Sequence, residues 1–410
     1  MRLAFIDLVF SWPPLGGAPL DLYYTMTGLQ ELGHEVHLFY AEEKDNWFLE
    51  AVQEERLPFP ATALAYDRND ADPRHLSMEF CTVVDEWKPD VVFQCFGFFM
   101  KPFVMQALAH YPQIIRYYAY EPFCPRDYRL YWKKKTCPKN YLRTPNACRR
   151  CTARGMHRVF KSSLVGGYAL EYKKTRAWTP EYYKVLVDSI RSSKAVIVYN
   201  HFTKGLLGNL NKNVHVIGGG VHLEHFNYVP LEEKPASEPT VIFMSGRADD
   251  GTKGLDTLMA AGKILWRERQ DFQIQVTIEG TTWNYLWFKE LGWCDVEKAR
   301  GLYTQSDICV VPSRWEEPFG LVATEAMACG RPCVVSDVGG LKEIVVPEET
   351  GFIFRRGKPK ELARCLCKLL DDPALRRQMG DAGRKRVEDI YEWKKVIQTH
   401  YPPILEAAVR

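Results

Sequence analysis

Short runs of β-branched and aromatic residues alternate along the chain with segments of helical periodicity, and this alternation constrains the fold more than any other feature. Parallel strands need a long crossover, usually a helix, so the pattern predicts parallel sheets covered by helices. In the first half we expect strands at residues 3–10, 36–40, 91–96, 114–118 and 195–199. In the second half we expect strands at residues 241–244, 273–278, 308–311 and 333–335.

Helical periodicity fills the segments between those runs. One helix is predicted to begin near Asp21, a residue type that caps helix N-termini, and to end before Gly33. In the second half, helices are predicted at about residues 254–266 and 320–329. The sequence therefore predicts two α/β halves in series.

The length of the chain indicates two domains, because 410 residues exceed what one hydrophobic core usually supports. Residues 218–238 are rich in Gly, Pro and charged residues, a composition typical of a linker. We place the N-terminal domain at residues 1–225 and the C-terminal domain at residues 226–388.

The apolar N-terminal run resembles a signal peptide at first sight, but Asp7 interrupts it and no small-residue cleavage site follows. No window approaches the roughly 18 to 20 apolar residues of a membrane-spanning helix. The twelve cysteines would fit a secreted disulfide protein only behind a signal peptide. We therefore expect a cytoplasmic protein with reduced thiols, with a peripheral position at the inner membrane face as a compatible option.

The most informative stretch is SDICVVPSRWEEPFGLVATEAMACGRPCVV, in which a buried strand ends in a polar loop and a helix begins near Gly320. Ligands of open α/β sheets bind at such strand ends, and a helix N-terminus presents N–H groups to an anion. Glu317 on the loop and Glu325 on the helix each offer a carboxylate to sugar hydroxyls. Gly320 lies between them and lets a ligand approach the backbone closely.

A second loop carries two cations. In MSGRADDGTKGLDTL, Arg247 and Lys253 follow another strand, while Gly246, Gly251 and Gly254 loosen the backbone. Two cations on one loop can bind phosphate groups, and Arg can do so through two parallel hydrogen bonds. Taken singly, each of these features also occurs as a solvated acid or an ordinary glycine turn of an α/β protein.

Taken together, the order Gly-Arg, Lys-Gly and Glu-x-Phe-Gly with a second Glu resembles family 4 of the retaining glycosyltransferases. That family has the GT-B fold, in which two Rossmann-like α/β domains face a central cleft. The resemblance covers nearly the whole chain, since GGAPLDLYYTMTGLQELGHEVHLF looks like the family's opening glycine loop and GGGVHLEHF like its interdomain segment. It is most specific over residues 306–354. It also implies that a helix at residues 389–410 crosses back to the N-terminal domain.

For the site, the resemblance implies that Arg247 and Lys253 hold the diphosphate of the donor. Glu317 would position the donor sugar, and Glu325 would bind the nucleotide ribose. The implied activity is transfer of a hexose-type sugar from a UDP or GDP sugar to a glycan or lipid-linked acceptor. Retention in this family is explained by same-face attack with the leaving phosphate taking the proton, so the protein supplies charge stabilisation and no cofactor is required.

Further donor contacts follow from the same resemblance. It places Gly16 and Gly17 against the donor phosphates or the acceptor, although glycine turns also occur for purely structural reasons. Gly246 belongs to the donor loop. Phe319 and Gly320 shape the segment between the two carboxylates.

One position departs from the family pattern. Many relatives carry Tyr-x-His-Glu-Pro at the end of an N-domain strand, whereas YYAYEP puts Tyr120 in place of the His and keeps Glu121. We predict both as sugar or acceptor contacts, with simple packing as the alternative for Tyr120. The departure favours a rival function, a non-catalytic sugar-nucleotide sensor or scaffold, while the complete donor set favours an enzyme. A phosphorylase or epimerase on the same fold has no supporting feature.

A basic insertion follows that strand, at about residues 122–185, with 16 Lys and Arg against three acidic residues. Cys124, Cys137, Cys148 and Cys151 are separated by twelve, ten and two residues, and the closing CxxC can bring two sulfurs to one tetrahedral metal. Structural zinc is the first candidate and an iron–sulfur cluster the second. Disulfides and free thiols remain alternatives to a metal site, because the first two spacings match no standard zinc module.

Aromatic residues are interleaved with the cations of the insertion, which fits an anionic partner on the acceptor side. A glycan or lipid-linked acceptor, with peripheral contact to an anionic membrane surface, ranks first. A solvated face ranks second, and nucleic acid third because no nucleic-acid recognition fold is evident.

Overall fold

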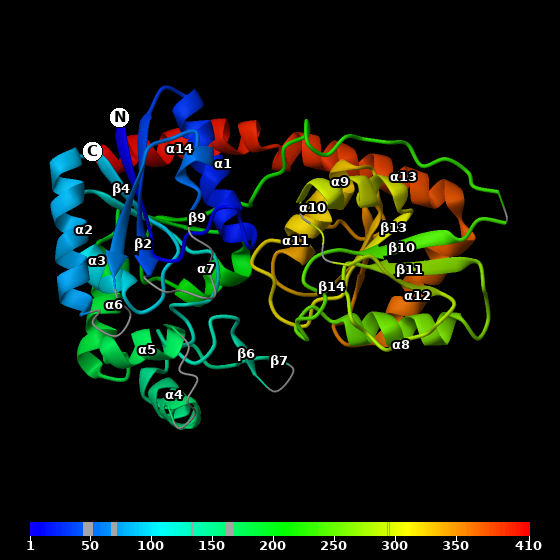
Figure 1. Ribbon diagram of the computed structural model, residues 1–410, viewed down its shortest axis with the longest axis horizontal. Helices are drawn as coiled ribbons and strands as arrows, with labels where there is room; N and C mark the ends of the chain where they lie inside the picture. Colours follow the sequence, from blue (N-terminus) through cyan, green and yellow to red (C-terminus); the bar gives the residue numbers. More distant parts are fainter. Residues whose placement is uncertain are drawn as a thin grey trace. The chain divides into compact units, whose positions relative to one another are not determined.

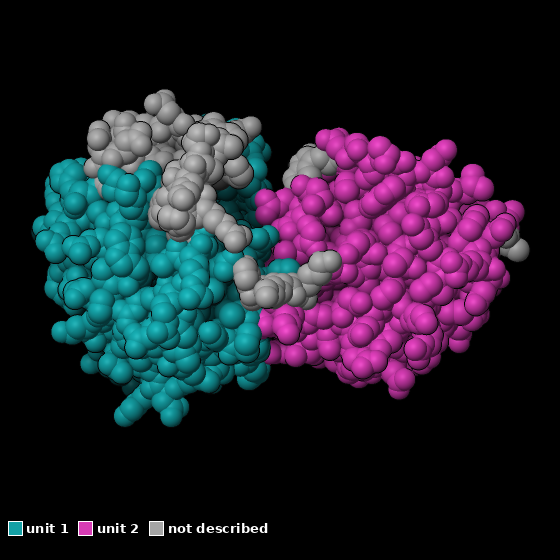
Figure 2. Space-filling model, turned by 90° about the horizontal axis from the view of Figure 1, so that it is seen from below, with its two compact units in different colours: residues 1–131, 137–217, 397–410 teal, residues 132–136, 218–396 magenta. Residues whose placement is uncertain are grey.

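The computed structural model describes residues 1–43, 52–66, 72–132, 135–160, 167–235, 237–292, 294 and 296–410. The chain forms two compact units (Figure 2), the first comprising residues 1–131, 137–217 and 397–410 and the second residues 132–136 and 218–396. The predicted boundary at residue 225 lies inside the second unit because the predicted linker packs there. Phe226 is buried, and Val221 forms an isolated β-bridge with Glu392.

Seven parallel strands form the sheet of the first unit, in the order β3-β2-β1-β4-β5-β8-β9. Strands β4, β5 and β8 are buried along their whole length, as expected for a parallel sheet with both faces covered. The elements are β1 (Arg2–Asp7), α1 (Gly17–Glu31), β2 (Glu35–Glu43), η1 (Glu54–Arg56), β3 (Ala61–Tyr66), α2 (Pro73–Trp87), β4 (Val91–Gln94), α3 (Lys101–Ala107), β5 (Gln113–Arg116), α4 (Pro145–Phe160), α5 (Gly167–Lys174), α6 (Pro180–Ser192), β8 (Ala195–Val198), α7 (His201–Leu207) and β9 (Val214–Val216).

The predicted insertion contributes structure of its own between β5 and β8. Its first part forms a two-stranded ribbon of β6 (Tyr131–Trp132) and β7 (Lys135–Thr136). Helices α4 and α5 follow and lie beyond the helices that cover the sheet (Figure 1). Apart from residues 132–136, which belong to the second unit, the insertion is therefore an appendage of the first unit.

Six parallel strands form the sheet of the second unit, in the order β12-β11-β10-β13-β14-β15. The elements are β10 (Thr240–Met244), α8 (Leu255–Leu265), β11 (Phe272–Val276), β12 (Phe288–Glu290), α9 (Val296–Gln305), β13 (Ile308–Val311), α10 (Leu321–Ala328), β14 (Cys333–Ser336), α11 (Leu341–Ile344), β15 (Gly351–Phe354), α12 (Pro359–Asp371), α13 (Pro373–Arg386), η2 (Val387–Tyr391) and α14 (Trp393–Val409). All nine predicted strands are present, and β3, β6, β7, β9, β12 and β15 are additional to them.

Helix α14 begins in the second unit and continues in the first, which it joins from residue 397 rather than from the expected 389. Within the first unit it packs against α1, where the hydroxyl groups of Thr25 and Tyr401 are 3.4 Å apart, and Figure 1 shows the two helices close together. Gly28 makes the approach possible, because a Cβ atom there would lie 2.8 Å from the side chain of Ile397. Residues 397–410 are thus an integral part of the first unit.

The prediction that Asp21 caps α1 is wrong. The helix already begins at Gly17, and Asp21 lies inside it with 2% of its surface exposed. Its Oδ2 accepts a hydrogen bond of 3.0 Å from Nη2 of Arg116, whose Nη1 donates to the carbonyl oxygen of Ile217. This buried ion pair connects α1 to β5, a contact that local sequence rules do not reveal.

Replacing Asp21 with Ala leaves the guanidinium of Arg116 buried without its counter-charge. We expect the free energy of unfolding to fall by about 3–5 kcal/mol, the usual cost of breaking a buried pair. Glu35→Ala breaks the exposed pair with Arg2 and should cost less than about 1 kcal/mol. Urea unfolding followed by circular dichroism measures both losses, and a loss below about 1 kcal/mol for Asp21→Ala would contradict the role given to this pair.

Candidate functional site

The loop after β10 is built from consecutive turns that depend on glycine. Gly246 has a φ of +95° and Gly254 a φ of +83°, a region that side chains rarely adopt. A Cβ atom on Gly254 would also lie 1.9 Å from the carbonyl oxygen of Pro312. Arg314 donates its backbone N–H to the carbonyl oxygen of Thr252, so this loop is held against the loop that follows β13.

Those two loops bring Lys253 and Glu317 together. The ammonium nitrogen of Lys253 lies 2.8 Å from Oε1 of Glu317, which also accepts hydrogen bonds from Ser313 Oγ at 2.6 Å and Trp315 Nε1 at 2.9 Å. Among the residues that the structure describes, none donates to Oε2 of Glu317. One carboxylate oxygen is thus held by three donors, and the other can accept a hydrogen bond from a ligand.

The segment after Glu317 is braced by a second pair of glycines. Gly340 donates its N–H to the carbonyl oxygen of Glu317 at 2.8 Å, and a Cβ atom on Gly339 would lie 2.0 Å from that oxygen. Phe319 is buried against Tyr391, with 5.7 Å between ring centroids. Gly320 has a φ of +133° and precedes α10. Gly339 and Gly340 therefore support the carboxylate loop directly.

Glu325 lies in the second turn of α10. Its Oε2 accepts a hydrogen bond of 2.8 Å from the hydroxyl of Tyr303, a residue whose importance the sequence did not signal. Removal of water around the carboxylate raises the pKa of Glu325 to about 7, and Tyr303 and Arg300 oppose this shift. Near neutral pH the side chain can act as a donor or an acceptor toward hydroxyl groups.

Glu316, which the sequence does not predict as a site residue, is held by three donors, as Glu317 is. Its Oε1 lies 2.5 Å from Nη2 of Arg356 and accepts from the hydroxyl of Thr136, while its Oε2 accepts from the N–H of Gly339. Thr136 belongs to the short segment of the insertion that is part of the second unit. Both oxygens of Glu316 are therefore engaged, so its role is to position the loop.

The remaining predicted donor residues are exposed. Arg247 lies on the surface of the loop after β10, and its backbone carbonyl accepts from the N–H of Asp250. Gly16 and Gly17 lie at the N-terminus of α1, which has no side-chain cap, and a Cβ atom on Gly16 would meet open space. Free N–H groups at a helix start can bind an anion. The donor contacts of these three residues stay predictions.

Tyr120 and Glu121 are buried instead, with 0% and 8% of their surfaces exposed. Tyr120 packs against Phe123 and Phe202. The oxygens of Glu121 have no hydrogen-bond partner among the described residues, and the ammonium of Lys101 is 3.8 Å from Oε1. Burial raises the pKa of Glu121, and Lys101 opposes that shift. Their predicted contact with a sugar or acceptor stays a prediction.

All twelve cysteines are free thiols. Cys148 and Cys151 lie on α4, and Arg126 Nη1 donates to Cys151 Sγ at 3.6 Å. Burial raises the pKa of Cys124 to about 12, with Cys137 contributing to the shift, and Cys148 is likewise affected by both Cys137 and Cys151. The four predicted thiols therefore share one electrostatic environment, although no three of them lie within 4.8 Å of one another in the described part of the chain.

The raised pKa of Glu325 makes stability depend on pH. Its ordinary value is 4.5 and its folded value is about 7, so the folded protein holds this proton more tightly than the unfolded chain. The stability that the proton contributes is complete below about pH 4.5 and is lost as the pH rises through about 7. We expect Glu325→Gln to gain stability relative to wild type between about pH 5 and pH 8 in urea unfolding. Glu348→Gln, at an exposed carboxylate, should show no such trend, and the same flat result for Glu325→Gln would contradict the assignment.

The second unit matches a known family. Residues 230–386 fit the family model described as glycosyl transferases group 1. The chain is 29% identical over 210 residues to the phosphatidyl-myo-inositol mannosyltransferase of Propionibacterium freudenreichii subsp. shermanii, a match that covers 50% of this chain and 52% of that protein. This chain spans about half the length of the curated relatives that it matches.

Solved structures extend the likeness to both units. Sucrose-phosphate synthase from Thermosynechococcus elongatus has a TM-score of 0.65 at 20% identity, covering 97% of this chain and 96% of that chain. Anabaena HepE in complex with UDP has a TM-score of 0.66 at 15% identity, covering 97% of this chain and 98% of that chain. The predicted GT-B fold of two parallel-sheet α/β domains is confirmed. Residues 230–386 therefore resemble the glycosyl transferases group 1 family, and both units have the GT-B fold.

Proposed function

We propose that this protein is a retaining glycosyltransferase of family 4 that moves a hexose-type sugar from a nucleotide diphosphate sugar to a glycan or lipid-linked acceptor. The contact between Lys253 and Glu317 carries the proposal. It joins a cation suited to phosphate with a carboxylate whose Oε2 can accept from a sugar hydroxyl. The two side chains come from different loops at the carboxyl ends of β10 and β13, where ligands of open α/β sheets bind.

In the proposed reaction, the bond between the anomeric carbon and the diphosphate oxygen breaks. The acceptor oxygen bonds to the same face of that carbon, and the proton of the acceptor hydroxyl passes to the leaving phosphate oxygen. Lys253, Arg247 and the N-terminus of α10 stabilise the negative charge that develops on the phosphate. Glu325 binds the ribose hydroxyls, and Tyr303 orients its carboxyl group. No step of this scheme needs a metal or cofactor.

The donor nucleotide is UDP or GDP in this proposal. Anabaena HepE, which shares the fold, was solved in complex with UDP, and this supports testing UDP sugars first. We propose a hexose as the transferred sugar because one relative is named as a mannosyltransferase, and mannose is a hexose.

The acceptor is proposed from the insertion and from the relatives. Sixteen cations at residues 122–185 favour an anionic acceptor or a membrane surface that carries one. One relative is named for a phosphatidyl-myo-inositol substrate, which is an anionic lipid. Among the described residues, no helix combines the length and apolar character that crossing a bilayer requires. We therefore propose peripheral contact with an anionic inner membrane face in the cytoplasm.

Cys124, Cys137, Cys148 and Cys151 are proposed to hold a structural metal, zinc before an iron–sulfur cluster. Four thiolates suit either group, and the shared electrostatic environment of these thiols supports the proposal. Binding would require the sulfurs to approach one another and to lose their protons. The metal would stiffen the insertion and take no part in the transfer.

Changing the proposed donor residues should strongly lower turnover while the fold survives. We expect Lys253→Ala and Glu317→Gln each to lower the rate of sugar transfer or donor hydrolysis by about 10²–10³-fold, because each removes a group that acts on the departing donor. Lys263→Ala provides a matched control, since Lys263 lies on α8 over the ring of Tyr285. Nucleotide release from a panel of UDP and GDP sugars measures the rates.

Calorimetry with the same panel separates the proposed enzyme from its rival. A donor that binds and is slowly hydrolysed by wild type, but not by the two variants, supports the transferase. If a donor binds and no turnover is seen with any acceptor or with water, the sugar-nucleotide sensor is the better description. If neither variant affects turnover, the donor-site assignment is wrong.

A further inference from the structure

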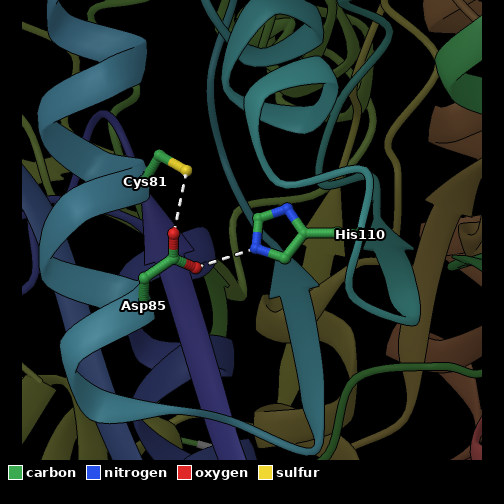
Figure 3. Close-up of side chains that lie close together, drawn as sticks. All are labelled: Cys81, Asp85 and His110. Carbon is green, nitrogen blue, oxygen red and sulfur yellow. Dashed lines mark hydrogen bonds and ion pairs between the residues drawn. The ribbon is translucent and has the colours of Figure 1, made fainter.

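A second cluster of ligating side chains lies in the first unit, away from the carboxyl ends of its strands. Cys81 and Asp85 are one turn apart on α2, and His110 lies in the connection between α3 and β5 (Figure 3). The thiol of Cys81 donates to Asp85 Oδ2 at 3.4 Å, and His110 Nε2 is 2.8 Å from Asp85 Oδ1. One ligand atom from each residue lies within 4.8 Å of the other two.

We propose that Cys81, Asp85 and His110 bind one zinc ion, with water as the fourth ligand. Sulfur, imidazole nitrogen and carboxylate oxygen are the ligand types that zinc takes in proteins. Three protein ligands leave one position open, and the half-exposed side chains of Asp85 and His110 give the ion access from solvent.

The spacing of the three groups fits a tetrahedral site after small movements. Bond lengths of about 2.0–2.3 Å to zinc place neighbouring ligand atoms roughly 3.3–3.5 Å apart in a tetrahedron. The distance of 3.4 Å from Cys81 Sγ to Asp85 Oδ2 already has this value. The distance of 2.8 Å between His110 and Asp85 is a hydrogen bond, which must lengthen when the ion replaces the proton.

Neighbouring groups hold the three ligands in place. The ring of His110 packs on that of Tyr111, with 4.3 Å between centroids. The thiol of Cys81 also lies 3.4 Å from the carbonyl oxygen of Ala107, near the end of α3. Supporting contacts of this kind orient ligands toward a metal.

The chain contains its own comparison on α12. Cys367 and Asp371 have the same spacing, and the thiol of Cys367 is likewise 3.4 Å from Asp371 Oδ2. There, however, the third group is the guanidinium of Arg269, which bonds to both side chains. A guanidinium has no lone pair for a metal and keeps its charge, so the α12 pair is a structural contact. For the α2 pair the third group is the imidazole of His110, which has a nitrogen lone pair, so the three side chains can bind a metal together.

The position indicates a structural role for the ion. The connection that carries His110 leads into the amino end of β5, and Cys81 and Asp85 lie in the last two turns of α2, which leads into the amino end of β4. This edge of the sheet is opposite to the carboxyl ends where substrates bind. An ion here connects α2 to the segment after α3, so it should stabilise the first unit without changing the transfer reaction.

The test is a zinc count on the full chain. Wild type, His110→Gln, Cys81→Ser and Cys367→Ser are stripped with a chelator, dialysed against Zn²⁺ and analysed by mass spectrometry. We expect wild type and Cys367→Ser to hold one equivalent more than His110→Gln and Cys81→Ser. Affinity should fall by more than about 100-fold on loss of His110, since even an outer contact typically costs about 10- to 100-fold.

Thermal unfolding and cobalt absorption test the zinc site independently of the zinc count. Thermal unfolding should shift upward with Zn²⁺ by more in wild type and Cys367→Ser than in His110→Gln, whose side chain is exposed enough for the variant to fold. Replacing zinc with Co²⁺ should give a sulfur-to-cobalt absorption band that decreases in Cys81→Ser. Equal zinc counts in wild type and His110→Gln would overturn the proposal, as would loss of the whole count in Cys151→Ser, which would assign the metal to the insertion. None of these outcomes depends on the glycosyltransferase assignment.

Discussion

The contact between Lys253 and Oε1 of Glu317 fixes the geometry on which the rest of the proposed donor site depends. Lys253 follows β10 and Glu317 follows β13, and these strands are neighbours in one sheet, so the contact bridges two adjacent strand ends. The side chains are 29% and 10% exposed, so the pair is largely buried and the cost of removing its charges from water offsets much of their attraction. Its value lies in holding a cation and a carboxylate at a separation suited to a phosphate and its sugar.

Two adjacent carboxylates have opposite functions around that contact. Glu316 has both oxygens occupied by Arg356, Thr136 and the backbone of Gly339. Glu317 has its donors gathered on one oxygen. A dipeptide of two glutamates gives no indication of this difference, because it arises from residues far away in the sequence. The family pattern singles out Glu317, and the contacts of Glu316 give the physical reason why its neighbour is a support.

The parts of the fold that the sequence predicted are those governed by local patterns. The strands with continuous apolar runs, such as β4, β8 and β13, were all found, because burial on both faces leaves a clear signal. Strands β12 and β15 were not predicted, since Phe-Lys-Glu is too short to show alternation and β15 begins at a glycine and has only three apolar residues. Asp21 was misassigned because a buried partner such as Arg116 overrides the usual preference of Asp for helix starts.

The residues of the candidate site also divide into those that local motifs reveal and those that only distant contacts reveal. Glu317, Lys253 and Gly320 stand in motifs whose order is specific, whereas Tyr303 and Arg356 act through contacts that no spacing encodes. Helices α2 and α12 show the same limit of spacing, because both carry a Cys followed four residues later by an Asp that its thiol contacts. What differs is the third side chain, supplied by a segment distant in sequence. A residue pair on a helix therefore defines a possible ligand set only once the fold decides whether an imidazole or a guanidinium faces it.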